Sequence, residues 1–571
     1  MEEMKVYIAN LIAKLIQNNI DEEEILKKIE LPKDIKNGDL SYPCFNLAKV
    51  LKKSPISIAD ELKQKIEKDC NISHVESIAG YLNFYLNNSM INCDVLTTII
   101  NKKENYGSKD IGNSKNVVID YSSPNIAKPF HLGHFRNTVL GSCLYKLYEN
   151  LEYNVIGINH IGDWGRQFGL LIEGYKLYKD EYDMKGDALK VLSDIYVRIN
   201  KLAKEDEKVL NRARQNFKEL EDGNLEYIKL WEYFREVSLR EYNRIYELLD
   251  CHFDSYNGEA FYNDKMDEVV HILDKKGVLK ESQGAKVVDV GSNMPPCIIL
   301  KSNGSTIYAT RDLAAILYRA REYDFEKALY VTGSEQILHF KQVFEVAKYL
   351  VDEKYQKGLI HIPYGMIRLK TGKMSTREGT IVYVDELINE AISKAKAIIK
   401  EKNANLDDID STAKIIGIGA LTFNYLKTSK IKDIIFDLDE ALRFDGETGP
   451  YVQYTYVRIL SVIKKSGIDV QMYDFSNVDF NLLSNKEEVS LIKKLGEFEE
   501  ILYNAAIENE PYILSRYLID VATMYSRFYN ECHVIVEDKK LMEARILLCY
   551  ATGIVIKKGL KILGISCPDK M

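Results

Sequence analysis

Two of the chain's nine histidines lie three positions apart in the stretch HLGH, at residues 131–134. The stretch stands between an apolar, β-branched run and a helical pattern, so we expect it where a buried strand leads into a helix. The free N–H groups and the dipole of a helix N-terminus favour anions, and histidines beside them add donors for phosphate. Gly133 has no side chain and lets a flat ring approach the backbone. His131, Gly133 and His134 therefore predict a nucleotide site.

A simpler alternative is that one histidine caps the helix while the other packs against it. Chance would place an HxGH motif in a chain of this composition far less than once, and the expected strand and helix flank it. We therefore favour the nucleotide site.

A cluster of cations, RLKTGKMSTREGT at residues 368–380, is the second chemical candidate. Lys370, Lys373 and Arg377 stand among small residues and two glycines. This composition is typical of a mobile loop whose cations close over a triphosphate. Taken alone, such a stretch is more often a solvated loop. Together with HLGH, it predicts the second half of a nucleotide site.

The elements that must position these motifs read as an α/β domain. VVIDYS and YNVIGI are expected as buried parallel strands, and the apolar face of residues 139–151 as the helix between them. Strand, helix, strand is the opening unit of a Rossmann-type, doubly wound sheet. Residues from about 175 to 250 are charged and helical and read as an insertion. We expect the runs KVVDV, CIILKS and KALYVTGS to continue the sheet.

The chain as a whole divides into three predicted domains. Residues 1–93 open with a helical pattern, end in the strand-like AGYLNFYLN and form a small α+β domain. Residues 94–430, which begin with a polar linker, form the α/β domain with its insertion at 175–250. Residues 431–571 show long helix-period segments and form an all-α domain.

Composition and charge limit the class of protein. The chain is 46% hydrophobic and 28% charged, and no apolar run reaches the roughly 18 residues that a membrane span needs, so we expect a cytoplasmic protein with no membrane partner. The nine cysteines include no CxxC pair, which predicts reduced thiols and no zinc. A net charge of -8 argues against broad coating of nucleic acid but leaves room for a local basic face.

HLGH followed by KMSTR resembles the two nucleotide-binding motifs of class I aminoacyl-tRNA synthetases. Further stretches make the resemblance more specific: SSPNIAKPFHLGH, HIGDWGRQFG, YATRDLAA, DEALRFDGETGPYVQYTYVR and the C-terminal CPDKM are similar to those of the arginyl-tRNA synthetases. The resemblance runs from NGDLSYP near the N-terminus to the last residue.

The resemblance implies a two-step reaction. The carboxylate of L-arginine attacks the α-phosphorus of ATP, and the terminal adenosine of tRNA(Arg) then accepts the arginyl group through its 2′-hydroxyl. Mg²⁺ is expected with the ATP. A carboxylate needs no strong base, so catalysis consists of positioning and of neutralising charge on the phosphates.

The resemblance also assigns the ATP site. His131 and His134 would donate to the phosphates, Lys373 and Arg377 would close on pyrophosphate, and Gly133, Met374 and Ser375 would complete the contacts. Thr376 stands where most class I enzymes have lysine, and Lys370 is the candidate to substitute for it. The division of work among Lys370, Lys373 and Arg377 stays open.

Selection of arginine requires carboxylates and a flat or hydroxyl-bearing partner for the planar guanidinium. The resemblance places Glu259, Tyr308 and Asp312 at the arginine side chain. It places Asp120, Asn125 and Gln336 at the α-amino and carboxylate groups or in the pocket wall. Asp312 is otherwise explained as an acid at a helix start, and Glu259 as a surface loop acid. His160 and Trp164 are either pocket lining or packing, without a chemical role.

The all-α domain is, by resemblance, the anticodon-binding domain. Tyr451, Tyr454 and Tyr456 could stack splayed bases and Arg458 could contact phosphate or base, although a tyrosine stripe at helical spacing is often core. Asn83 and Tyr85 of the N-terminal domain resemble a surface for the tRNA elbow.

The family resemblance further implies a monomer in which arginine activation requires bound tRNA. The alternatives are a small-molecule adenylyltransferase, which would lack the helical domain, and a non-enzymatic RNA-binding paralogue, in which the motifs would be expected to decay.

Overall fold

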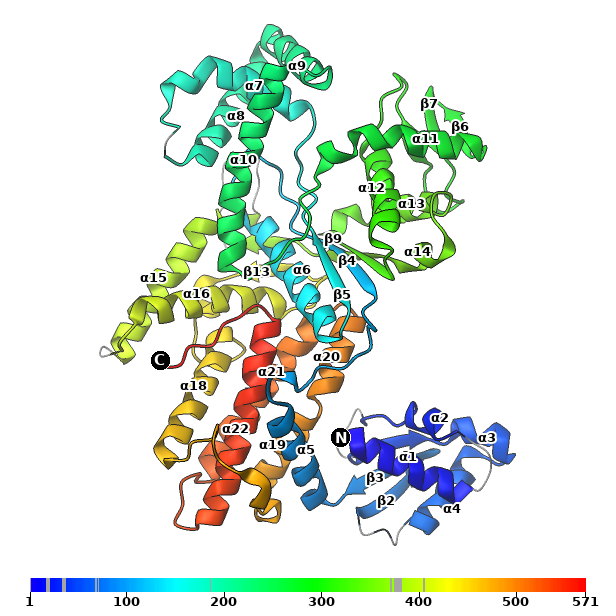
Figure 1. The fold of residues 1–571 in the computed structure, drawn as a ribbon, viewed down its shortest axis with the longest axis vertical. Helices are drawn as coiled ribbons and strands as arrows, with labels where there is room; N and C mark the ends of the chain where they lie inside the picture. The colour runs from blue at the N-terminus through cyan, green and yellow to red at the C-terminus, as the bar shows by residue number, and fades with distance from the viewer. Residues whose placement is uncertain are drawn as a thin grey trace. The chain divides into compact units, whose positions relative to one another are not determined.

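The computed structural model (Figure 1) describes residues 2–16, 21–32, 37–66, 69, 71–184, 186–369, 372–373, 383–403 and 406–571. The chain forms two compact units. The first comprises Met1–Gly107, Thr455–Glu500 and Ile519–Lys558, and the second Ser108–Tyr454, Ile501–Leu518 and Gly559–Met571. Among the described residues, no helix combines the length and apolarity needed to cross a bilayer.

A four-stranded parallel sheet of order β10-β9-β4-β5 is the centre of the second unit. Its strands are β4 (Asn116–Asp120), β5 (Asn154–Ile158), β9 (Lys327–Gly333) and β10 (Leu359–Tyr364). Val117, Val118 and Ile119 of β4 are buried, as expected for a strand covered on both faces. The strand order reverses between β4 and β9, which is where a doubly wound sheet opens a crevice for ligands. The predicted Rossmann-type fold class is confirmed.

Helix α6 (Leu132–Asn150) connects β4 to β5 and begins directly after the HLGH motif's first histidine. Leu140, Leu144 and Leu147 are buried on it, as the predicted helical face requires. The expected strand, helix, strand unit is therefore present.

Two of the runs expected to continue the parallel sheet do not join it, so that expectation was wrong. KVVDV and CIILKS supply β7 (Ala285–Val288) and β8 (Cys297–Leu300), which form a separate antiparallel sheet with β6 (Leu279–Ser282). The physical reason is the connection. Gln283 and Gly284, with φ of 52° and 77°, make a two-residue hairpin turn between β6 and β7, whereas parallel neighbours need a long crossover.

The helices around this second sheet are α11 (Met266–Lys275), α12 (Tyr308–Tyr323), α13 (Ile337–Ala347) and α14 (Glu353–Gly358). Buried side chains of α11, α12, β8 and β9 form one hydrophobic core. This core fixes α12, which carries two of the predicted arginine contacts.

The predicted helical insertion is present as four helices, α7 (Arg166–Tyr178), α8 (Ala188–Glu205), α9 (Glu207–Glu221) and α10 (Leu225–Leu248), drawn in teal to green in Figure 1. Asp187, Asp206 and Asn224 start α8, α9 and α10 by accepting backbone N–H groups.

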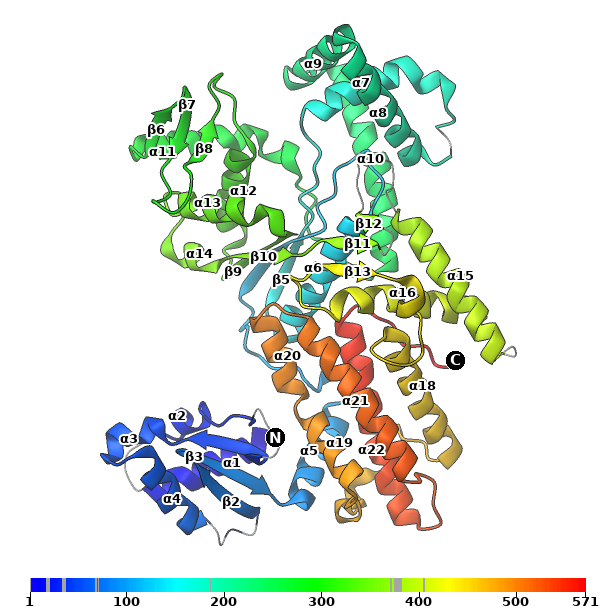
Figure 2. The same cartoon turned by 180° about the vertical axis from the view of Figure 1, so that it is seen from behind.

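A small third sheet of order β12-β11-β13 follows in the chain and is seen from behind in Figure 2. It consists of β11 (Ile367–Leu369), β12 (Gly372–Lys373) and β13 (Ile434–Phe436), with α15 (Val384–Lys402) and α16 (Ile409–Leu426) between its strands in sequence. β13 lies within the range expected to be all-α; the short α17 (Leu438–Ala441) follows it.

The first unit combines the N-terminal module with helices from the C-terminal part. The module has an antiparallel sheet of order β1-β3-β2. Its elements are α1 (Glu2–Ile16), α2 (Glu22–Leu26), β1 (Leu40–Pro43), α3 (Phe45–Leu51), α4 (Pro55–Ile66), β2 (Ile72–Ile78), β3 (Tyr81–Leu86) and α5 (Asn88–Lys102).

The long C-terminal helices are α18 (Gly449–Ser466), α19 (Lys486–Gly496), α20 (Phe498–Ile507), α21 (Tyr512–Glu531) and α22 (Lys539–Ile562). Within the first unit, Asn92 of α5 donates to the carbonyl of Leu483 (2.8 Å), just before α19, and Lys493 pairs with Asp39 (2.5 Å). The expected helical C-terminal part of the fold is confirmed.

Candidate active site

His131 and His134 form a reciprocal cap at the N-terminus of α6. Nδ1 of His131 accepts the backbone N–H groups of Gly133 (3.1 Å) and His134 (3.4 Å), and Nδ1 of His134 accepts that of His131 (3.4 Å). The two rings stack with centroids 3.6 Å apart. Because each Nδ1 accepts, the proton of each neutral imidazole is on Nε2. Both histidines therefore cap the helix and keep an Nε2–H donor.

Burial keeps both imidazoles neutral. It lowers the pKa of His131 to about 4, with the nearby Lys128 charge adding to the effect. It lowers the pKa of His134 well below its ordinary value, with smaller contributions from His131 and Lys128. At pH 7 the pair thus offers two hydrogen-bond donors without positive charge. Any charge for phosphate must come from neighbouring cations.

Lys128 is one such cation, and it was not among the residues expected at the site. Burial lowers the pKa of its ammonium group, and the Lys128 charge acts on both histidines. The signal was available, since Lys128 lies three residues before His131 in the same loop.

Gly133 is needed for close packing of the cap. A Cβ at this position would lie 3.0 Å from Cε1 and 3.1 Å from Nδ1 of His131. A larger residue would therefore shift the His131 ring. The glycine serves the histidine pair itself, in addition to the expected approach of a flat ligand.

The structure describes the backbone at the start of the second motif and again from Tyr383, three residues past the motif's end. Lys373 of β12 pairs with Arg368 of β11, and Tyr383 forms a β-bridge with His131. The N–H of Val384, at the start of α15, donates to the carbonyl of Phe130 (2.9 Å). The chain that follows the second motif, at Tyr383 and Val384, thus lies beside HLGH. Lys370, Met374, Ser375 and Arg377 lie outside the described residues, as does the side chain of Lys373.

Asp120 stands at the carboxyl end of β4 and pairs with a buried arginine. Its Oδ2 lies 2.8 Å from a guanidinium nitrogen of Arg319, and its Oδ1 accepts the hydroxyl of Ser123 (2.9 Å). Arg319, on α12, is fully buried, and the same nitrogen lies 3.3 Å from Nδ1 of His160. His160 stacks on the buried ring of Tyr262. Arg319 was not among the residues expected at the site, although it is a lone cation on an apolar helix face.

Replacing Arg319 with methionine is expected to lower the free energy of unfolding by about 3–5 kcal/mol, because it leaves the Asp120 carboxylate without its buried partner. Urea unfolding followed by circular dichroism measures the change. Arg321→Met, on the exposed side of the same helix, is the control and should lose less than about 1 kcal/mol. Equal losses in both variants would contradict a structural pairing of Arg319 with Asp120.

Glu259 and Asp312 supply two further carboxylates near this edge. Glu259 starts the 3-10 helix Glu259–Lys265, its side chain is 17% exposed, and its Oε2 lies 3.5 Å from Arg311. Asp312 is the fifth residue of α12, past the first turn, and its Oδ2 lies 2.6 Å from Nε2 of His339. Glu259 is therefore not simply an acid of a surface loop. Asp312 is likewise not explained by its place near the start of a helix. Arg311 and His339 were missed by sequence reasoning.

Burial raises the pKa of Glu259 to about 7, with the Asp312 charge adding to the rise and Arg311 opposing it. The group therefore gains its negative charge as the pH rises through about 7. If this carboxylate binds a guanidinium, the dissociation constant for arginine should fall about tenfold per pH unit below that value and level off above it. Calorimetric titration with arginine from pH 6 to 8 checks this. A Glu259→Gln variant should show no such slope; an equal slope in both would assign it to another group.

The remaining predicted pocket residues lie at the same end of the sheet or at the start of α12. Asn125, in the loop after β4, packs its amide so closely over Gly162 that a Cβ there would clash with Oδ1. Gln336 follows β9 and is exposed. Tyr308, the first residue of α12, is 69% exposed. The structure thus gathers Asp120, Asn125 and Gln336 at the carboxyl edge of β4 and β9.

The predicted tRNA contacts differ in exposure. Tyr454 is 38% exposed, whereas Tyr456 is buried and belongs to the core. Tyr451 is half-buried, and the guanidinium of Arg458 lies 5.4 Å from the centre of the Tyr529 ring.

In the N-terminal module, Asn83 is buried and accepts a hydrogen bond from Ser41 (2.7 Å). Tyr85 donates to Glu76 (3.0 Å) and stacks on His74. Of these two residues, Tyr85 is the one that the structure leaves partly accessible.

The residues near HLGH fit the phosphates of ATP, because they combine neutral donors with the Lys128 cation. Within the described part of the chain, no group of three histidine, cysteine or acidic side chains is arranged to hold a metal ion. The described cysteines are free thiols.

Three family models match consecutive parts of the chain. "tRNA synthetases class I (R), catalytic domain" matches residues 95–438, "DALR anticodon binding domain" matches 452–571, and "Arginyl tRNA synthetase N terminal domain" matches 2–86. The parallel sheet, the histidine cap after its first strand and the catalytic-domain match define a class I aminoacyl-tRNA synthetase.

Relatives and solved structures agree with this class. The arginine–tRNA ligase of Clostridium botulinum (strain Loch Maree / Type A3) is 46% identical over 566 residues, covering 98% of this chain and 99% of its own. That of Clostridioides difficile (strain 630) is 42% identical over the full length of both. The Thermus thermophilus arginyl-tRNA synthetase shares the fold with a TM-score of 0.83 at 24% identity, covering 99% of this chain and 100% of that one. The chain belongs to the arginyl-tRNA synthetase family, and its activity is that of an arginine–tRNA ligase.

Proposed function

We propose that the HLGH site activates L-arginine with ATP and Mg²⁺. The main support for this proposal is the reciprocal histidine cap. Since both Nδ1 atoms are engaged by the backbone, both Nε2–H groups are available to the α- and β-phosphates as charge develops there. Neutral donors suit this task because they need no proton exchange with solvent. Gly133 leaves room for the adenosine part of ATP.

The cations of the second motif complete the ATP site in this proposal. Lys373 and Arg377 neutralise the leaving pyrophosphate, Lys370 substitutes for the lysine that Thr376 replaces, and Met374 and Ser375 contact the nucleotide. Mg²⁺ arrives with ATP and offsets phosphate charge. The β-bridge between Tyr383 and His131 supports placing the end of this motif beside the phosphates.

Arginine selection is proposed to rest on three carboxylates. Glu259 and Asp312 receive the guanidinium, with Tyr308 against its face, while Asp120, Asn125 and Gln336 hold the α-amino and carboxylate end. The pair formed by Asp120 and Arg319 supports this division, because a carboxylate already neutralised by a buried arginine competes little for the substrate guanidinium.

The transfer step brings tRNA(Arg) to the same site. We assign Tyr451, Tyr454 and Arg458 to the anticodon. We assign Tyr85, with Asn83 two residues before it in the same strand, to the elbow. The protein acts as a cytoplasmic monomer in this proposal, with 1–93, 94–430 and 431–571 as its domains.

Arginine activation in this proposal requires bound tRNA. Exchange of labelled pyrophosphate into ATP, with arginine present, is expected to rise at least about tenfold on adding tRNA(Arg). A non-cognate tRNA is the control. Full exchange without tRNA would contradict the requirement while leaving the ligase activity untouched.

A further inference from the structure

Arg136 is a buried cation two residues beyond the histidine pair. It is 2% exposed, and burial lowers the pKa of its guanidinium to about 10, so it stays charged at neutral pH. Within the described ranges, no carboxylate lies at ion-pair distance from it. A buried charge held without a counter-ion is expensive, so its position calls for a specific role.

The guanidinium of Arg136 bonds to four backbone carbonyls on two separate segments. One terminal nitrogen donates to Gly365 (2.5 Å) and Met366 (3.3 Å), and the other to Lys430 (2.9 Å) and Lys432 (2.8 Å). The first segment leads into β11, which pairs with β12 and hence with Lys373; the second leads into β13. The Arg136 side chain therefore binds both segments that lead into strands of the third sheet.

The two segments also contact each other closely. The N–H of Gly365 donates to the carbonyl of Lys430 (2.9 Å), and that of Ile434 to Met366 (2.9 Å). A Cβ at Gly365 would lie 2.6 Å from the carbonyl oxygens of Ile431 and Lys432. Glycine is thus required for this approach, and any larger residue would push the segments apart.

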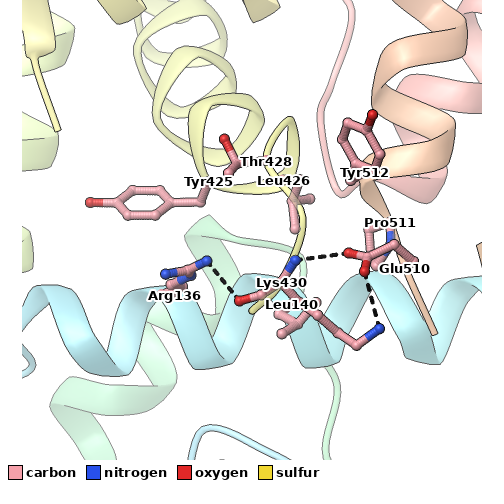
Figure 3. A pocket seen from close by; sticks show the side chains of 9 residues that line it. All are labelled: Arg136, Leu140, Tyr425, Leu426, Thr428, Lys430, Glu510, Pro511 and Tyr512. Atoms are coloured by element: carbon pink, nitrogen blue, oxygen red, sulfur yellow. Dashed lines mark hydrogen bonds and ion pairs between the residues drawn. The ribbon is translucent and has the colours of Figure 1, made fainter. Parts of the chain in front are cut away.

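Glu510 holds the second segment from the opposite side (Figure 3). Its carboxylate accepts the N–H of Lys430 (2.8 Å), the hydroxyl of Ser429 (3.1 Å) and the ammonium of Lys430 (3.1 Å). The adjacent Asn509 accepts the hydroxyl of Tyr148, on α6, at 3.0 Å. Segment 429–432 is therefore fixed between α6 and the chain that leads into α21.

We infer that Arg136 is a positioning residue for arginine activation, and that with Glu510 it fixes the strand pair carrying Lys373 relative to His131 and His134. The inference rests on the roles proposed above for those three residues. Arg136 contacts no substrate; it acts through the backbone of the segments that enter the third sheet. A displacement of about 1 Å between catalytic groups costs on the order of 100-fold in rate, so such an anchor is kinetically significant.

Arg136→Lys tests the inference, because lysine keeps the charge but loses the planar fork that reaches four carbonyls. In the full-length enzyme with saturating tRNA, kcat for pyrophosphate exchange should fall about 100-fold, while KM for arginine should change less than about threefold. Gly365→Ala should give the same pattern without altering Arg136. Glu510→Gln should give a smaller loss of kcat, since it removes the charge but keeps one acceptor. The control is Arg321→Met, an exposed arginine on α12.

Hydrogen exchange supplies a second measurement. The amides of Gly365 and Ile434 should exchange faster in Arg136→Lys, with those in the middle of α6 unchanged. A lowered melting temperature with kcat within about threefold of the parent in both Arg136→Lys and Gly365→Ala would overturn the inference. His134→Ala distinguishes failure of the positioning role from failure of the proposed ATP site. If His134→Ala is inactive while Arg136→Lys is fully active, only the positioning role fails. If His134→Ala is also fully active, the proposed ATP site fails with it.

Discussion

Replacing His134 with alanine is expected to lower kcat for arginylation of tRNA by about 100- to 1000-fold, the usual cost of losing one preorganised donor to transition-state charge. The substitution removes an Nε2–H donor, and it also leaves the backbone N–H of His131 without the ring that accepts it. KM for arginine should change little, because Glu259 and Asp312 come from other elements. The measurement is transfer of labelled arginine to tRNA(Arg) under saturating ATP.

His271→Ala, an exposed histidine on α11, is the matched control and should keep the parent rate. His134→Gln adds a sharper comparison, since its side-chain amide reaches about as far as the imidazole Nε2 and restores a donor there but not the stacked ring. We expect it to recover part of the lost rate. Unchanged kcat in His134→Ala, in a folded protein, is the result that removes these histidines from the phosphate site.

Replacing Asp312 with asparagine should lower kcat/KM for arginine by about 100-fold, because a guanidinium then meets an amide where it needs a carboxylate. The change also leaves Nε2 of His339 without its anionic partner at 2.6 Å. KM for ATP should be nearly unchanged, which separates a substrate-binding effect from general damage. Steady-state arginylation with each substrate varied in turn measures both constants.

Asp324→Asn is the control for Asp312→Asn, because it makes the same chemical change at the far end of the same helix. Asp324 has a positive φ of 41°, which asparagine tolerates, and its side chain is exposed. It should retain full activity. If KM for ATP rises as much as KM for arginine, Asp312 supports the whole site and does not select the amino acid.

Much of the fold was predictable because local patterns and long-range packing agree. The β-branched strand before HLGH and the apolar face after it are strong, short-range signals, and the structure contains both elements. KVVDV and CIILKS are equally apolar, yet they form a hairpin sheet of their own. Apolarity does not decide between parallel and antiparallel partners; the two-residue turn at Gln283 and Gly284 does.

The site was less predictable where the role of a residue depends on buried partners from other parts of the chain. HLGH is visible as a motif, but its reciprocal cap depends on ring positions that no spacing encodes. Arg319 and Arg136 are single cations within apolar helical patterns, and only their partners reveal why: a carboxylate at the end of strand β4 for Arg319, and four carbonyls from two distant segments for Arg136. Such partners are far away in sequence and leave no local signature.

The reciprocal histidine cap has a consequence for how this site can change over evolutionary time. Each imidazole accepts the backbone N–H of the other histidine. Losing either histidine therefore weakens the hydrogen bonding that positions the other. The two positions should behave epistatically: the double replacement of His131 and His134 should cost far less than the product of the single losses. A lineage that gave up one histidine would then face little further selection to keep the second, and the motif would disappear as a unit.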